Sequence, residues 1–181
     1  MIQQGNILIA KPYLQSTYFK RTVIYLCEHT SQGTLGFVMN KPHGIFLKDI
    51  FPHLKQGHFP LFEGGPVSPQ ELFYIHTIGL KLSDSIEISK GVYMGGDFDE
   101  LSRLIEQKKI NNTQIRFFVG CSSWDEHQLD NEIQREDWFL QPTIYDELVQ
   151  SFPDELWGNE LAKINPSFKA FSDFSFDPSL N

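Results

Sequence analysis

Cys121 is the residue of this sequence whose placement most directly suggests chemistry. It follows the apolar run QIRFFVG (residues 114–120) and precedes a charged stretch that predicts a helix. A cysteine at such a junction can have a lowered thiol pKa and act as a nucleophile, with His127 as its base. The alternative is a capping box, in which Ser123 caps a helix from Trp124 to about Arg135. We favour the capping interpretation, because His127 lies a full turn beyond the cap and need not face Cys121.

A second candidate is the loop FEGGPVSPQE (residues 62–71). Gly64 and Gly65 permit backbone angles that are closed to other residues, and Pro66 restricts the exit from the loop. The segment from Ser68 to Glu71 predicts one capped helical turn. Such a loop can offer backbone N–H groups to an anion, although its spacing matches neither common nucleotide-binding loop. A purely structural turn is the alternative interpretation.

Polar residues also lie near the ends of predicted strands. His29 and His76 have such positions, and Cys27 shares a strand face with His29. A zinc site needs three or four converging ligands at recognisable spacing, which this sequence lacks. We therefore expect no metal and no cofactor, and histidines that hydrogen-bond to nearby backbone.

The third group of candidates is Arg21, Asn40 and Lys41. Asn40 in the sequence Asn-Lys-Pro predicts a turn in which its side chain bonds local backbone. Arg21 opens a predicted strand. It is expected either to pair structurally with a carboxylate or to supply the positive group of a pocket, and the sequence leaves both open.

The elements that must position these residues indicate an α+β fold. Strands and helices are intermixed without regular βαβ alternation, and two hairpins are predicted, one joining residues 21–29 to 34–40 and one around Lys90-Gly91. A short helix that ends at Pro52 is predicted within residues 44–54. A second helix is predicted to begin after its N-cap Asp97, and a third is predicted over residues 153–164 with Pro153 in its first turn. We expect a single domain over residues 1–165. The tail, residues 166–181, holds four phenylalanines (Phe168, Phe171, Phe174 and Phe176) and is expected to lie on the body or on a partner.

Charge restricts the classes of partner. The formal net charge is −8, which disfavours direct binding to nucleic acid. The charge is segregated: the basic residues of 1–60 (Lys11, Lys20, Arg21, Lys41, Lys48 and Lys55) outnumber its acids, whereas Arg135 is the one base of the acidic segment 125–160. No helix-turn-helix with a basic recognition helix is predicted. No signal peptide or membrane-spanning run is recognisable, so we expect a cytoplasmic protein without a membrane partner.

Several fragments in this order resemble one family, AlgH/YqgE, also labelled UPF0301. They are GNILIAKPYL (5–14), FKRTVIYLCEH (19–29), GTLGFVMNKP (33–42), FEGGPV (62–67), YMGGDFDEL (93–101) and VGCSSWDEHQLDNEI (119–133). The resemblance implies an α+β domain with a bifurcated, mixed and largely antiparallel sheet curled into a partial barrel and flanked by helices. It implies a bacterial cytoplasmic protein labelled a transcriptional regulator from a genetic association with alginate production. It brings no established catalytic residues.

The last fragment departs from the family signature, which resembles G-Y-A-G-W followed by G-Q-L-E. Gly120, Trp124, Gln128 and Leu129 match it, whereas Cys121 stands where the family has Tyr and His127 where it has Gly. A cysteine nucleophile is therefore not a shared feature of the family.

These observations favour a non-enzymatic regulatory or interaction protein that affects transcription indirectly. It is expected to bind a partner protein, or else a nucleic acid, through the basic N-terminal region and the Gly-Gly-Pro loop. The alternative is a small-ligand-binding protein or an enzyme with a pocket at the Gly-Gly-Pro loop. Candidate binding residues for either function are Arg21, His29, Asn40, Lys41, Gly64, Gly65, Pro66, His76, Trp124 and Gln128.

Overall fold

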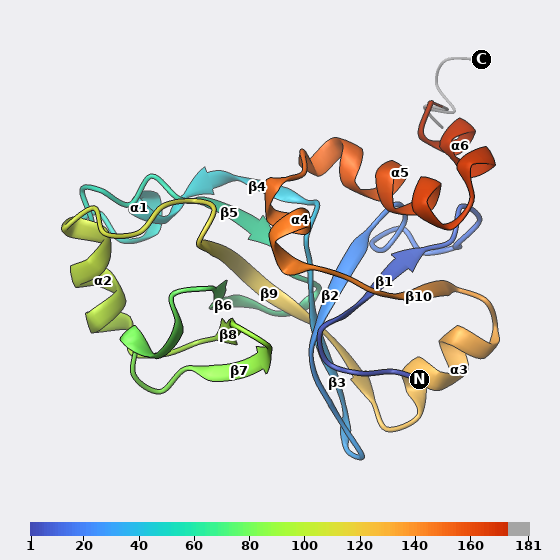
Figure 1. Cartoon of the computed structure of the whole chain (residues 1–181), viewed down its shortest axis with the longest axis horizontal. Helices are drawn as coiled ribbons and strands as arrows, with labels where there is room; N and C mark the ends of the chain where they lie inside the picture. Colours follow the sequence, from blue (N-terminus) through green and yellow to red (C-terminus); the bar gives the residue numbers. More distant parts are fainter. Residues whose placement is uncertain (174–181) are drawn as a thin grey trace.

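The fold is built around one long strand, β9, which crosses the middle of the molecule (Figure 1). The computed structural model describes residues 1–173. Its strands are β1 (Asn6–Ala10), β2 (Val23–Thr30), β3 (Gly33–Val38), β4 (Pro42–Phe46), β5 (Pro60–Glu63), β6 (Val67–His76), β7 (Ile86–Ser89), β8 (Val92–Met94), β9 (Ile115–Asp125) and β10 (Trp138–Pro142). Its helices are α1 (Leu47–Ile50), α2 (Phe98–Glu106), α3 (Gln128–Gln134), α4 (Tyr145–Gln150), α5 (Pro153–Ile164) and α6 (Ala170–Asp173), with 3-10 turns η1 (Gly79–Lys81) and η2 (Pro166–Lys169).

The sheet is bifurcated at β9. The strand order is β10-β1-β2-β3-β9-β6-β8-β7, and β5 pairs with β9 as a branch that also carries β4. The last residues of β9 pair with β3, whereas residues 117–119 pair in parallel with β5. All pairings except that of β5 with β9 are antiparallel. The sheet is partly curled without closing (Figure 1). The predicted α+β class with a bifurcated mixed sheet is confirmed.

β9 separates two hydrophobic cores because successive side chains of a strand point to opposite faces. Phe117 belongs to the core beneath α1 and α2, and Phe118 belongs to the core beneath α4 and α5. Both rings are fully buried. This placement explains why residues 115–119 read as an apolar run, which is typical of a strand covered on both faces.

The elements that carry their own local signals form as predicted. The hairpins β2–β3 and β7–β8 are both present. Asp97 caps α2 by accepting a hydrogen bond from the Glu100 backbone N–H. The carboxylate of Glu100, however, accepts from Ser83 rather than completing a capping box.

Two predicted helix starts are wrong. Ser123 lies inside β9, which continues to Asp125, and α3 begins only at Gln128 behind His127. The segment from Ser68 to Glu71 is part of β6 and not a helical turn. In both cases pairing with a distant strand overrides the local capping pattern, since β9 pairs with β3 and β6 pairs with β9.

The described part of the tail lies on the body of the protein. Phe168 and Phe171 pack against the core under α5, and the Phe168 ring lies 5.8 Å from that of Phe139. Phe174 and Phe176 lie outside the described residues. Within residues 1–173, no helix has the length and apolar character that a membrane crossing requires.

Candidate functional site

Asn40 joins the end of β3 to the start of β2. Its Oδ1 accepts from the Val23 N–H at 2.9 Å, and its Nδ2 donates to the Arg21 carbonyl at 2.9 Å. The Arg21 guanidinium lies 4.7 Å from the centre of the Trp157 ring and donates to the Phe171 carbonyl at 2.8 Å. Asn40 therefore bonds backbone that lies 17 and 19 positions earlier in the chain, whereas the sequence pattern predicted a bond within its own turn. The contacts of Asn40 and Arg21 connect β2, β3, α5 and α6.

Lys41 is half-buried on the same side of the molecule. Its Nζ donates to the Tyr18 carbonyl and lies 4.0 Å from the centre of the Tyr18 ring. Burial lowers the pKa of Lys41, and the nearby Glu63 carboxylate opposes that shift. Lys41 therefore fixes the segment before Arg21 in place.

Gly64 and Gly65 connect β5 to β6, and both of these strands pair with β9. The Gly64 N–H donates to the Val119 carbonyl, and the Gly64 carbonyl accepts from the Val38 N–H and from the Ser122 hydroxyl. A Cβ on Gly65 would overlap the Cys121 carbonyl. In the Gly-Gly-Pro segment, Gly64 and Gly65 are buried and Pro66 is exposed. The backbone of Gly64 is thus committed to the sheet.

His29 lies at the far end of the β2–β3 hairpin. Its Nδ1 shares a 2.8 Å hydrogen bond with the Thr34 hydroxyl. It borders a cavity of about 320 Å³ whose lining includes Asp125 and Asp130. Cys27 is buried in the core. Among the described residues, no group of three or more His, Cys, Asp or Glu side chains is placed to hold a metal ion.

His76 is fully buried and bonded at both ring nitrogens. Nε2 lies 3.0 Å from the Gly95 carbonyl, and Nδ1 lies 3.3 Å from the Ile78 N–H. Because a carbonyl only accepts and an N–H only donates, Nε2 carries the proton and Nδ1 is the acceptor. Burial lowers the pKa of His76, and the hydrogen bond to Gly95 partly opposes that shift. The neutral ring is therefore part of the structure.

This arrangement predicts a pH-dependent stability. Because the folded-state pKa of His76 is lowered, the unfolded chain binds the proton more readily below about pH 6.5. The free energy of unfolding should be fully retained above that pH and should fall as the pH drops below it. In His76→Gln, urea unfolding measured between about pH 7.5 and 5 should show a smaller slope in this window. Replacing the exposed His53 with Gln should keep the wild-type slope, and an unchanged slope in His76→Gln would refute the assignment.

The stretch around Cys121 does not form the predicted helix cap, and the environment of its thiol disfavours a nucleophile. Burial raises the pKa of the Cys121 thiol, with a further contribution from Glu71. A nucleophilic cysteine requires the opposite shift. His127 has a left-handed backbone, with φ of +60°, and precedes α3. Glycine adopts that conformation without strain, which explains why the family signature has Gly at this position.

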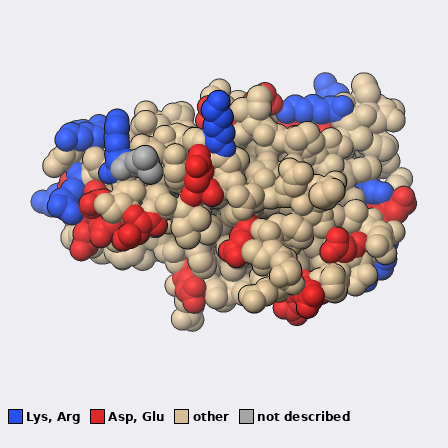
Figure 2. All heavy atoms as spheres, turned by 60° about the horizontal axis from the view of Figure 1, so that its bottom comes forward, with Lys and Arg blue, Asp and Glu red and all other residues tan. Residues whose placement is uncertain are grey.

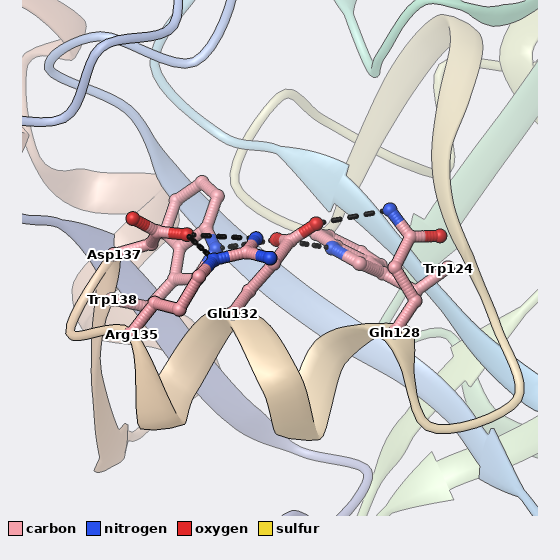
Figure 3. A network of polar contacts seen from close by, with 6 residues as sticks. All are labelled: Trp124, Gln128, Glu132, Arg135, Asp137 and Trp138. Carbon is pink, nitrogen blue, oxygen red and sulfur yellow. Dashed lines mark hydrogen bonds and ion pairs between the residues drawn. The ribbon is translucent and has the colours of Figure 1, made fainter.

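Trp124 and Gln128 meet at Glu132, which sequence reasoning did not single out (Figure 3). One Glu132 oxygen accepts from the indole N–H groups of Trp124 and Trp138, each at 2.8 Å. The other accepts from Gln128 Nε2 at 2.9 Å. The two indoles pack edge to face, and the Phe19 ring stacks on Trp124. The carboxylate thus joins α3, β9 and β10.

The predicted residues form separate groups and not one pocket. Arg21, Asn40, Lys41 and Gly64 lie where β2, β3 and β5 meet, and Trp124 and Gln128 lie at α3. His29 and His76 occupy different strand ends. A cavity of about 650 Å³ lies elsewhere, between β4, β5 and the α4–α5 connection, and it includes Arg116. Arg116 was not among the predicted residues, although a lone arginine inside an apolar strand could have indicated it.

Basic and acidic side chains are interspersed on the face in Figure 2. Lys and Arg gather at the end that carries α1 and α2 and along the upper edge, with Asp and Glu between them. The basic residues of the N-terminal segment are held in contacts: Lys11 pairs with Glu136 at 3.6 Å, and Arg21 and Lys41 bond backbone carbonyls. On this face the basic side chains do not form one continuous patch.

The chain is similar over nearly its whole length to known proteins. The sequence model of a family described as AlgH-like matches residues 7–169. A UPF0301 protein of Parabacteroides distasonis is 36% identical over 180 residues, covering 98% of this chain and 91% of the relative. A UPF0301 protein of Cytophaga hutchinsonii is 34% identical and covers 100% of both chains.

Solved structures show the same architecture. The solution structure of the AlgH protein from Pseudomonas aeruginosa superposes with a TM-score of 0.76 at 26% identity, over 95% of this chain and 94% of that one. A crystal structure of a Corynebacterium diphtheriae protein superposes with a TM-score of 0.77 at 22% identity, over 96% and 93% of the two chains. The latter likeness concerns the fold alone.

Proposed function

The chain belongs to the AlgH-like family, and from that premise we propose that it is a non-enzymatic regulatory protein of the bacterial cytoplasm. It acts by binding a partner protein, and its effect on transcription is indirect. The hydrogen bonds of His76 and Asn40 support binding over catalysis, because a catalytic role would have to break them. Burial also raises the pKa of the Cys121 thiol, which disfavours a nucleophile.

The observation that carries the proposal is an apolar surface with an acidic rim around α4. Ile144 and Phe152, which flank this helix, are 63% and 73% exposed. Large exposed apolar side chains beside charged residues mark candidate interaction sites. The rim consists of exposed carboxylates, of which Glu147 pairs with Lys163. We define the α4 surface as Ile144, Asp146, Glu147, Phe152, Asp154 and Glu155.

Charge complementarity specifies the partner of the α4 surface. Its acids disfavour a nucleic acid and favour a basic protein surface that presents an apolar side chain toward Phe152. A regulator with this surface reaches a promoter through a basic protein and not through DNA. The family label of transcriptional regulator and the acidic segment 125–160 are then consistent with each other.

We expect a photo-reactive phenylalanine at position 152 to yield one discrete adduct in living cells. The matched control is the same residue at Ile86, which is 63% exposed on strand β7. The charge reversals Asp154→Lys and Glu155→Lys should together reduce the adduct yield on the order of tenfold, because the partner is basic. Mass spectrometry of the adduct identifies the partner.

Two outcomes would contradict this function. One is an equal yield of adducts at positions 86 and 152, and the other is a yield that charge reversal does not change. A second test measures binding of labelled duplex DNA by fluorescence anisotropy at about 50 mM salt. We expect no binding there, and tight DNA binding that weakens steeply with salt would replace the protein partner with nucleic acid.

A further inference from the structure

The cavity beside β5 has the size and lining of a small-molecule site. Its volume is about 650 Å³, within the roughly 300–1,000 Å³ of ligand pockets. It lies between the β4–β5 pair, the start of β9 and the connection from α4 to α5 (Figure 1). Its apolar lining comes chiefly from Pro42, Pro60, Phe62, Ile115, Val149 and Pro153.

Arg116 is the one charged side chain among the residues that line this cavity. It is 7% exposed. Nη1 donates to the Met39 carbonyl at 2.9 Å and Nη2 to the Val149 carbonyl at 3.1 Å. The guanidinium carbon lies 4.3 Å from the centre of the Phe62 ring. No ion pair links Arg116 to a carboxylate within residues 1–173.

The hydrogen bonds leave part of the guanidinium available. A guanidinium has five N–H donors, and the described residues accept from two of its three nitrogens. No fully buried side-chain nitrogen of the described residues lacks a partner. Nε of Arg116, which has no hydrogen-bond partner there, is therefore not fully buried, and Arg116 lines the cavity. The two carbonyls and the ring hold the guanidinium in one orientation.

A buried charge without a counter-charge is costly, and an anion in the cavity would remove that cost. Burial lowers the pKa of Arg116, which is consistent with a poorly solvated cation. Arginine remains protonated in proteins, so the positive charge persists. Its planar fork matches a carboxylate, and most of the lining around it is apolar.

We propose that this cavity binds a small molecule with one carboxylate on an apolar body. The carboxylate sits on the Arg116 guanidinium, and the body packs against Phe62, Ile115 and Val149. The site goes beyond the proposed function, because it takes a small ligand inside the cavity, and it shares only Phe152 with the α4 surface. Pro42 and Pro60 also line the cavity and bring no competing charge to it.

The test uses two probes of matched shape, naphthalene-2-carboxylate and naphthalene-2-carboxamide. Isothermal titration calorimetry should show that the wild-type protein binds the carboxylate at least about tenfold more tightly than the amide. Arg116→Gln should remove this preference, whereas Arg116→Lys should keep part of it. Lys109→Met removes an exposed cation elsewhere and should leave both affinities unchanged.

A measurement on the wild-type protein covers the case in which the Arg116 variants do not fold. In ¹H–¹⁵N spectra, the carboxylate should shift the Arg116 Nε–H signal and the backbone amides of Phe62 and Ile115. Equal affinities for the two probes would overturn the proposal, as would carboxylate-induced shifts confined to another surface. Absence of binding by either probe at millimolar concentration would also overturn it.

Discussion

Gly64→Ala is expected to lower the free energy of unfolding by about 3 kcal/mol or more, or to prevent folding. A Cβ at this position would lie well under 3.0 Å from the Gly120 carbonyl and from the Phe37 ring. The backbone cannot yield easily, because Gly64 bonds Val119 on one side and Val38 on the other. Urea unfolding followed by tryptophan fluorescence measures the loss, and the soluble fraction on expression reports a variant that does not fold.

Gly44→Ala is the matched control for this prediction. Gly44 has a φ of +86°, and an added Cβ would meet no atom within 4 Å. Its replacement should cost only about 1 kcal/mol, which is the penalty for the left-handed backbone. Similar losses for the two variants would mean that the close approach at β9 is not the reason for glycine at position 64.

The Gly-Gly-Pro loop also shows what the sequence can predict and what it cannot. Two adjacent glycines predict unusual backbone conformation or close packing, and close packing is what the structure shows. The packing partner is β9, some 55 residues further along the chain, and this pairing depends on the topology of the sheet. Nothing in the local pattern of residues 62–67 contains that information.

The hairpins and the best-capped helix were predictable because their signals are local. The four residues between the two β-rich runs imply the β2–β3 hairpin, and Asp97 satisfies the first turn of its own helix. Ser123 carries a similar capping signal and is nevertheless in a strand. There the pairing of β9 with β3, at Leu35 and Ser123, outweighs the local preference.

The candidate sites were harder to predict, since they depend on groups that are distant in sequence. Arg116 could have been noticed as a cation in an apolar strand, but its contacts with the Val149 carbonyl and the Phe62 ring follow from the positions of α4 and β5. Glu132 is one of 23 acids. Its role follows only from the packing of Trp124 against Trp138.

Glu132→Ala is expected to lower the free energy of unfolding by about 3 kcal/mol. The carboxylate accepts hydrogen bonds from the indoles of Trp124 and Trp138, whose side chains are buried. Removing it leaves two indole N–H groups without an acceptor in a largely dry site, and each unsatisfied donor costs about 1–3 kcal/mol. Urea unfolding measures the change, and near-UV circular dichroism shows whether the two indoles keep their packing.

Glu132→Gln separates the acceptor role from the charge. The amide keeps one carbonyl oxygen in place, so we expect a loss of about 1–2 kcal/mol, smaller than that of the alanine variant. Asp130→Ala on the same helix removes an exposed carboxylate and should change stability by no more than about 0.5 kcal/mol. If Glu132→Ala cost no more than Asp130→Ala, the contacts around Glu132 would not be what joins α3 to β9 and β10. The stacked Phe19 ring would then remain as the contact that fixes Trp124.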